Sequence, residues 1–321
     1  MSDKTKFLIT GSSGFIGKHF IQFLDNSTTN AEVIGVDIVP SSLTDTKSIV
    51  LHEEMCTIND SNAVQLLLQK HKPDYIVHFA SQSSVAKSWV DISTTFYNNV
   101  NSFITLAESV RQYCSDARML VIGSSEEYGN VAPDNIPIKE TCPLHPQNPY
   151  AIARVAQEML AKMYVQSFGL DIVMTRSFNH IGPGQSEAFA IPSFVKQIVT
   201  AKNNNTSCTL KTGNIDVVRD FVDVRDAVKA YYLLLDKGMT GEVYNICSGN
   251  GYSLRTIITM LSEITSIHVV IEHDQSKMRP TEVQTIIGSY QKINKLTGWS
   301  PTINIHQSLE DIVKGQSLAL M

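Results

Sequence analysis

Three glycines spaced three residues apart, Gly11, Gly14 and Gly17, constrain the fold of this chain more than any other feature. They follow a short apolar segment at residues 6–10 and open a segment with helical spacing at residues 14–25. Such a turn needs glycine because the chain reverses tightly, a phosphate approaches its backbone, and the helix packs closely on the strand. Glycines at this spacing also fit an ordinary tight turn, but the order strand, turn, helix, strand favours a dinucleotide-binding turn.

Short apolar segments alternate with amphipathic segments through the first half of the chain, as in βαβ units. The predicted strands cover residues 6–10, 32–37, 75–79, 119–123 and 171–176. The predicted helices cover residues 14–25, 60–71, 94–114 and 150–168. Because most of these strands are apolar throughout, they predict an α/β fold, a Rossmann-type doubly wound parallel sheet with helices on both faces.

The pattern changes after residue 176, where Gly, Pro and polar residues interrupt the alternation. We therefore predict two domains built from non-contiguous pieces. The NAD-binding Rossmann domain takes residues 1–178 and 217–247. A smaller α/β substrate-binding lobe takes residues 179–216 and 248–321.

An acidic residue ends the second predicted strand. Asp37 lies 20 residues after Gly17, where a carboxylate can accept hydrogen bonds from both hydroxyls of an adenosine ribose. The same carboxylate repels a 2′-phosphate, so we predict NAD as the cofactor and NADH in preference to NADPH. A solvated carboxylate at a strand end is the simpler alternative.

Charge and cysteine content narrow the classes of partner. The chain has 26 basic and 31 acidic residues, a formal charge of −5, and no cluster of Lys and Arg. This balance argues against a nucleic-acid surface and favours a small substrate. No segment is apolar enough for a membrane span or signal peptide. The five widely spaced cysteines predict reduced thiols in a cytoplasmic protein and no zinc site.

The start of the fourth predicted helix carries Tyr150 and Arg154, which are one turn apart and share a helix face. Ser124 follows the fourth predicted strand in the segment Ser-Ser-Glu-Glu-Tyr-Gly. With the Gly-rich turn, these residues resemble the extended short-chain dehydrogenase/reductase superfamily. The resemblance implies that Tyr150 exchanges a proton with the substrate oxygen, that Ser124 holds this oxygen, and that the cation beside Tyr150 binds the nicotinamide ribose. Arg154 stands where the superfamily has Lys; it keeps the charge but has a different shape.

Three motifs in the second half are similar to the GDP-mannose 4,6-dehydratase group. They occupy residues 177–185, 213–226 and 279–283, and they are most like those of the group's reductases, which form GDP-rhamnose. The resemblance implies a GDP-sugar substrate. It assigns the sugar diphosphate to Asn179, Arg219 and Arg279, and a nucleotide ribose to Glu282. Arg219 could instead pair with the acids that flank it.

The resemblance also completes the predicted cofactor site. Its residues are Gly11, Ser13, Gly14, Phe15, Ile16, Gly17, Asp37, Ala80, Ser81, Asn99, Tyr150 and Arg154. Thr57 stands where the family usually has an Asp that contacts adenine. His78, His145 and His180 lack partners at metal-ligand spacing, so we expect structural roles for them.

Two further residues bear on the reaction type. In dehydratases of the group, the residue equivalent to Glu126 removes a proton and the one equivalent to Ser125 helps a hydroxyl leave. The segment 182–185 lacks the arginines typical of those dehydratases. We therefore predict NAD(P)H-dependent reduction of the C4 keto group of a GDP-4-keto-6-deoxyhexose. The alternatives are a dehydratase, a nucleotide-sugar 4-epimerase and a non-catalytic NAD-binding protein. The helices at 94–114 and 150–168 carry apolar residues on more than one face. In the resembling enzymes the equivalent helices form a dimer interface, so the resemblance implies a homodimer.

Overall fold

The large lobe is built on one parallel sheet. The computed structural model describes residues 4–27, 30–40, 46–275 and 283–319. Seven parallel strands occur in the spatial order β10-β6-β5-β4-β1-β2-β3. Their bounds are β1 Thr5–Thr10, β2 Ala31–Asp37, β3 Val50–Met55, β4 Tyr75–His78, β5 Arg118–Ser124, β6 Ile172–Ser177 and β10 Val243–Ile246. This order confirms the predicted Rossmann-type fold, and the chain reverses direction across the sheet between β1 and β4.

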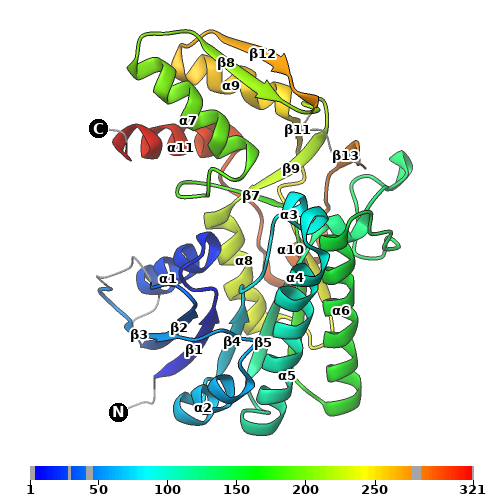
Figure 1. The fold of residues 1–321 in the computed structure, drawn as a ribbon. Coiled ribbons are helices and arrows are strands. Elements are labelled where there is room, and N and C mark those ends of the chain that lie inside the picture. The colour runs from blue at the N-terminus through cyan, green and yellow to red at the C-terminus, as the bar shows by residue number, and fades with distance from the viewer. Residues whose placement is uncertain (1–3, 28–29, 41–45, 276–282, 320–321) are drawn as a thin grey trace.

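Helices cover both faces of this sheet (Figure 1). On one face lie α1 (Phe15–Ser27) and α8 (Val224–Lys237); on the other lie α2 (Ser61–His71), α5 (Ser102–Tyr113) and α6 (Pro149–Phe168). Alternate residues of β1 supply the two cores: Phe7 and Ile9 pack toward α1 and α8, and Leu8 packs toward α2 and α5. This alternation explains why the strand is apolar throughout.

Two elements of the large lobe differ from the prediction. The edge strand β3 was not predicted, because its sequence Val-Leu-His-Glu-Glu-Met is mostly polar and largely exposed. The helix predicted at residues 94–114 is interrupted: α4 (Ile92–Phe96) is followed by a π-helical turn at Tyr97–Asn101 before α5 begins. Such turns are frequent at functional sites.

The small lobe has its own core. It consists of α7 (Ala190–Asn203), α9 (Leu254–Thr265) and α11 (Ile305–Ala319) with the strand pair β8 (Cys208–Thr212) and β12 (Val269–His273). A small sheet of β11 (Gly251–Ser253), β9 (Val218–Asp223), β13 (Thr285–Ile286) and β7 (Asn179–Ile181) lies between this lobe and the large one (Figure 1).

The division of the chain into 1–178 plus 217–247 and 179–216 plus 248–321 stays a prediction, and one segment packs differently from it. Ile293, in α10 (Gln291–Thr297), and Trp299 belong to the core of the large lobe. The Trp299 indole donates a hydrogen bond to the backbone oxygen of Asp226 in α8. The C-terminal part of the chain therefore returns to the large lobe before α11.

None of the helices in the described ranges has the length and apolar character that a membrane-crossing helix requires.

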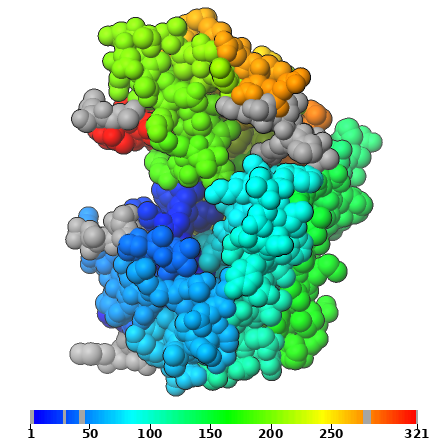
Figure 2. Space-filling model, viewed as in Figure 1, coloured from blue at the N-terminus to red at the C-terminus, as the bar shows by residue number. Residues whose placement is uncertain are grey.

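Between the lobes, the space-filling view is hollowed, and dark blue atoms of the N-terminal segment lie at the base of the hollow (Figure 2).

Candidate active site

A cavity of about 790 Å³ lies at the carboxyl ends of the strands. This is where ligands bind in doubly wound sheets. Its lining joins residues from the Gly-rich turn, from β2 and β5, from the segment after β4, from the start of α6 and from the small lobe. The predicted site residues that line it are Gly11, Ser13, Gly14, Phe15, Ile16, Gly17, Asp37, Ala80, Ser81, Ser124, Glu126, Tyr150, Arg154, Asn179 and Arg219.

The Gly-rich turn has no room for side chains. A Cβ atom on Gly17 would lie 2.2 Å from the Gly11 backbone oxygen, and one on Gly11 would lie 2.8 Å from the Ala80 backbone nitrogen. Gly11 also has φ +70°, which favours glycine. The turn therefore leaves its backbone and the first turn of α1 facing the cavity, as a bound diphosphate requires. These residues fit a dinucleotide cofactor.

Asp37 stands at the end of β2 and lines the cavity. Its carboxylate accepts hydrogen bonds from the backbone nitrogens of Ser13 at 3.0 Å and Ile38 at 2.7 Å. These contacts tie the carboxylate to the Gly-rich turn. Among the described lining residues the only Arg or Lys side chains are those of Arg154 and Arg219.

A short helical turn at Ser125–Tyr128 positions the predicted catalytic loop after β5. Ser124 caps this turn: its hydroxyl accepts the backbone N–H of Glu126 at 3.2 Å, and its own backbone N–H donates to the Glu127 carboxylate at 2.7 Å. Asn148, the N-cap of α6, donates from Nδ2 to Glu126 Oε2 at 2.9 Å. The loop and the start of α6 are thus held together at the cavity.

Tyr150 and Arg154 are brought together as the helix spacing predicts. The Arg154 Nε donates to the Tyr150 hydroxyl at 3.3 Å, and its Nη2 donates to the Ser81 hydroxyl at 2.6 Å. Arg154 is buried, with 4% of its surface exposed. A guanidinium in this place can stabilise negative charge on the tyrosine oxygen.

A buried charged cluster lies beneath the catalytic loop. Arg176 donates to both carboxylate oxygens of Glu158 at 2.8 Å, and Glu127 lies beside them with Oε2 3.8 Å from Arg176 Nε. Glu127 Oε2 has no hydrogen-bond partner in the described structure. Burial, together with the negative charge of Glu158, raises the pKa of Glu127 to about 8. The folded protein therefore favours a protonated Glu127 at neutral pH.

On the substrate side, Asn179 in β7 and Arg219 in β9 line the same cavity as the Gly-rich turn. The three acids near Arg219 engage other groups. Asp216 pairs with Arg255 at 2.7 Å, Asp220 accepts bonds from Ser248 and two glycine backbones, and Asp223 pairs with Arg225 at 2.8 Å. Arg279 and Glu282 lie outside the described residues.

Two predicted residues do not line the cavity. Ser125, the first residue of the helical turn after β5, is buried and is not part of the cavity lining. Asn99 lies in the π-helical turn and uses both ends of its amide on the backbone of Gln82, accepting at 2.7 Å and donating at 3.0 Å. It fixes the loop that follows β4, and the neighbouring Asn98 lines the cavity in its place.

The buried histidines near the cavity bond to hydroxyl groups. His78 Nδ1 lies 2.9 Å from the Thr10 hydroxyl, and His180 Nε2 lies 2.7 Å from the Tyr231 hydroxyl. Burial lowers the pKa of His78 to about 3 and that of His180 to about 4, so both rings are neutral. Within the described ranges, no cluster of three His, Cys, Asp or Glu is arranged to hold a metal ion.

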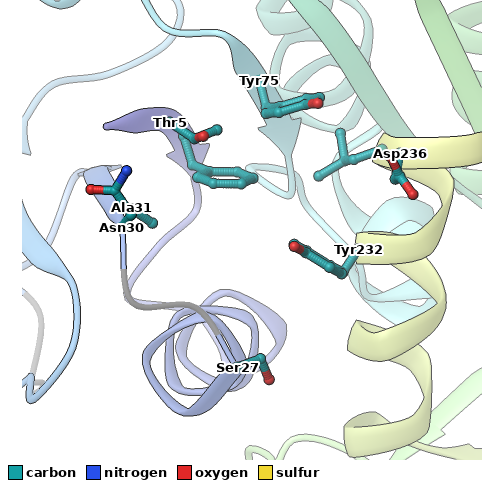
Figure 3. Close-up of a pocket in the computed structure, with 9 residues that line it drawn as sticks. Thr5, Ser27, Asn30, Ala31, Tyr75, Tyr232 and Asp236 are labelled. Atoms are coloured by element: carbon teal, nitrogen blue, oxygen red, sulfur yellow. The ribbon is translucent and has the colours of Figure 1, made fainter. Parts of the chain in front are cut away.

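A second cavity of about 430 Å³ lies at the opposite, amino-terminal edge of the sheet. Tyr75 and Tyr232 face each other across it, with Asp236 at one side (Figure 3). It contains none of the predicted site residues.

Sequence reasoning missed several residues that shape the active-site cavity. Glu127 was identifiable, because Ser124 and Glu127 form the Ser-x-x-Glu pattern of a capping box. Asn148 before Pro149 carried the signal of a helix N-cap. Gln82 carried no such signal, since its contact with Asn99 joins positions 17 residues apart. Gln157 lies three residues after Arg154, and this helical spacing was the one signal for their contact.

The similarity to known proteins agrees with this geometry. Residues 8–312 match the sequence profile of the family described as GDP-mannose 4,6 dehydratase. The chain is 34% identical to a GDP-6-deoxy-D-mannose reductase of Pseudomonas aeruginosa, covering 96% of both proteins. It is 29% identical to a GDP-6-deoxy-D-talose 4-dehydrogenase of Aggregatibacter actinomycetemcomitans, covering 98% of this chain and 99% of the relative.

A solved structure of RMD from Pseudomonas aeruginosa in complex with NADPH superposes with a TM-score of 0.86 at 32% identity. It covers 98% of this chain and 100% of that one. The fold of this chain agrees with that structure over nearly its whole length. The chain belongs to the GDP-mannose 4,6-dehydratase family of extended short-chain dehydrogenases/reductases.

Proposed function

We propose that this protein reduces the C4 keto group of a GDP-4-keto-6-deoxyhexose with a nicotinamide cofactor, forming GDP-6-deoxymannose (GDP-rhamnose). One observation carries the proposal. Ser124, Tyr150 and the Gly-rich turn line the same cavity, in a chain 34% identical to a GDP-6-deoxy-D-mannose reductase. The absence of arginine from residues 182–185 also favours a reductase over a dehydratase.

The cofactor would be held by the Gly-rich turn, Asp37, Ala80, Ser81 and Arg154. When bound, it supplies the hydride for the carbonyl carbon. Each of these residues lines the cavity. The turn gives backbone N–H groups to the diphosphate, and Asp37 accepts hydrogen bonds from a ribose.

Ser124 and Tyr150 would act on the carbonyl oxygen. A hydroxyl that accepts one hydrogen bond keeps its own proton to donate, so Ser124 can accept the Glu126 N–H and still bond the substrate oxygen. Tyr150 donates the proton that converts this oxygen to a hydroxyl. Arg154 Nε, 3.3 Å from the Tyr150 oxygen, stabilises the charge left on the tyrosine.

Asn179 and Arg219 would hold the sugar diphosphate. The guanidinium of arginine matches phosphate oxygens with paired donors. Arg279 and Glu282 complete this part of the proposal on the strength of the family resemblance.

A coupled assay tests the reaction. The purified protein is mixed with NADH and enzymatically prepared GDP-4-keto-6-deoxymannose, and NADH absorbance and the nucleotide sugars are followed. We expect loss of NADH matched by a new GDP-6-deoxyhexose. Unchanged NADH with no new product would refute the proposal.

The cofactor preference is a separate part of the proposal. Asp37 supports NADH, because it is fixed at the end of β2 and would face a 2′-phosphate. The similar structure from Pseudomonas aeruginosa carries NADPH, which makes a direct comparison necessary. Titration of the protein with both cofactors should give the tighter dissociation constant for NADH. Equal dissociation constants for NADH and NADPH would refute the proposed preference for NADH.

Dehydration is the second candidate activity, favoured by Glu126. Its carboxylate lines the cavity and is oriented by Asn148. Ser125, which should assist the leaving hydroxyl, does not line it. Conversion of GDP-mannose to the keto sugar by the protein with only bound cofactor would establish the dehydratase.

We also propose that the protein is a cytoplasmic homodimer. All five cysteines are free thiols in the structure, which supports a reducing compartment. Helices α3 (Val85–Val90), α4 and α6 lie together and expose large apolar side chains, which a partner copy could cover. These residues are Trp89, Val90, Ile92, Ile152, Met159 and Phe168, and Tyr97 of the adjoining π-helical turn is also exposed. Sedimentation as a monomer at micromolar concentration would contradict the dimer.

A further inference from the structure

Arg154 is held on several sides by groups of this chain. Besides the Tyr150 and Ser81 hydroxyls, its Nη1 donates to the backbone oxygen of Ile122 at 3.0 Å and to Gln157 Oε1 at 2.7 Å. The guanidinium thus donates hydrogen bonds from its three nitrogens to four acceptors. A planar fork bound in this way has one orientation.

Gln157 is the one side chain in this group outside the cavity lining that contacts Arg154. It lies three residues after Arg154 on α6, and only 1% of its surface is exposed. Its amide nitrogen has no hydrogen-bond partner within the described structure. The bond to Arg154 is the one hydrogen bond of the Gln157 side chain within the described residues, so no other polar group fixes it.

We infer that Gln157 is a positioning residue, which rests on the proposed reductase function: it orients the Arg154 fork so that Nε faces Tyr150 and Nη2 faces Ser81. A lysine at position 154 ends in a single ammonium group and lacks the second branch of the fork. It cannot serve Tyr150, Ser81, Ile122 and Gln157 together. Buried acceptors that lose their donor cost free energy, so lysine is a poor replacement in this chain.

This inference predicts an outcome opposite to the one the family resemblance suggests. If position 154 needs only a positive charge, Arg154→Lys should match or exceed the native activity. If the fork and Gln157 work as a unit, Arg154→Lys should lower activity, and a second change at Gln157 should then cost little more.

A double-mutant cycle tests whether Gln157 acts through Arg154. Native protein, Gln157→Met, Arg154→Lys and the double variant are compared for kcat and KM with NADH and GDP-4-keto-6-deoxymannose. NADH dissociation constants are measured by fluorescence without sugar. We expect Gln157→Met to lower kcat about tenfold, to weaken NADH binding severalfold, and to change the KM for the sugar less than twofold. In the Arg154→Lys background, its effect on each quantity should be less than about twofold.

Three controls separate positioning from a fold defect. Gln157→Glu keeps an acceptor for Arg154 and should stay within about threefold of native kcat. Gln157→Ser, which is too short to reach the guanidinium, should reproduce the loss if Gln157→Met fails to fold. Gln69→Met, on the exposed face of α2, should change nothing.

Equal losses from Gln157→Met in both backgrounds would overturn the inference, as would an Arg154→Lys variant at least as active as the native protein. The NADH-binding cycle does not need the sugar. If the native protein fails to reduce the keto sugar, the proposed function fails, while the binding cycle still decides whether Gln157 acts through Arg154.

Discussion

The two ends of the cavity differ in which part of the chain shapes them, the backbone at one end and side chains at the other. At the cofactor end, the Gly-rich turn is shaped by backbone, and a single Cβ on Gly17 would overlap the Gly11 oxygen. At the reacting end, Tyr150 and Arg154 are placed by side-chain hydrogen bonds, several of them buried. A side chain at Gly11 or Gly17 would meet backbone atoms, whereas Arg154 at the other end is held by side-chain and backbone acceptors that suit its guanidinium.

This contrast shows where variation is tolerated. A backbone site fails when any atom is added, because nothing around it can move away cheaply. A side-chain site can change chemically if its partners change with it. The following experiments, in order of decreasing expected effect, test each end in turn.

The largest effect should come from the reacting end. Tyr150→Phe removes the proton donor and should lower kcat about 1000-fold, while NADH binding changes little. Steady-state kinetics and fluorescence titration measure the two quantities. Tyr113→Phe, at a partly exposed position of α5, is the control and should keep native kcat. A Tyr150→Phe variant within tenfold of native would mean that another group supplies the proton.

The next effect should come from the backbone end. Gly17→Ala should weaken NADH binding about 100-fold, because its Cβ meets a backbone oxygen at 2.2 Å and the turn must open. Gly315→Ala in α11 is the matched control, since its nearest neighbour would lie 4.0 Å away. That change should leave binding intact. Native affinity in Gly17→Ala would show that the turn is not the cofactor site.

A smaller effect is expected at Asp37, the side chain predicted to contact the cofactor ribose at the cofactor end of the cavity. Asp37→Ala should shift the ratio of NADPH to NADH dissociation constants about tenfold toward NADPH, because repulsion of the 2′-phosphate is removed. Titration of both cofactors checks the ratio, with Asp116→Ala on the surface as the control. A ratio unchanged by Asp37→Ala would leave the carboxylate without a role in selectivity.

The smallest effect concerns the folding stability of the protein and its dependence on Glu127, which is buried near the reacting end of the cavity. The pKa of Glu127 is raised from 4.5 to about 8 by burial and by Glu158, so the folded chain keeps a proton that the unfolded chain releases. This contribution to stability is present below pH 4.5 and is lost as pH rises toward 8. Gln at this position stays neutral and still accepts the Ser124 N–H.

The Tm of Glu127→Gln relative to native should therefore rise by about 5 °C between pH 5 and pH 8. Any cost of burying the amide is the same at both pH values and cancels in this comparison. A difference in Tm that stays constant across this range would mean that Glu127 is ionised in the folded protein.

The sequence was sufficient for the parts of the molecule that depend on local rules. The strands β1, β2, β4, β5 and β6 have consecutive apolar residues at their centres, because both faces of the sheet are covered. The Gly-rich turn and the Tyr150 and Arg154 pair follow from short spacings. Edge strand β3 could not be predicted, since its residues are mostly polar and exposed and lack the apolar pattern of the other strands.

The parts of the site that depend on distant contacts were not accessible in this way. Asn99 was expected at the cofactor, but the π-helical turn directs its amide to the backbone of Gln82. Ser125 was expected at the substrate, but in the helical turn after β5 it is buried and does not line the cavity. Gln157 is three residues from Arg154 on the predicted helix, but this spacing alone does not specify which of the helix's polar pairs form a hydrogen bond.

An isotope experiment tests the proposed reduction most directly. The protein is incubated with GDP-4-keto-6-deoxymannose and NADH that carries deuterium at the transferable C4 position, and the product is examined by mass spectrometry and NMR. The account predicts GDP-6-deoxymannose with one deuterium on sugar C4. A product without deuterium, or no product while the cofactor remains bound and unoxidised, would contradict it.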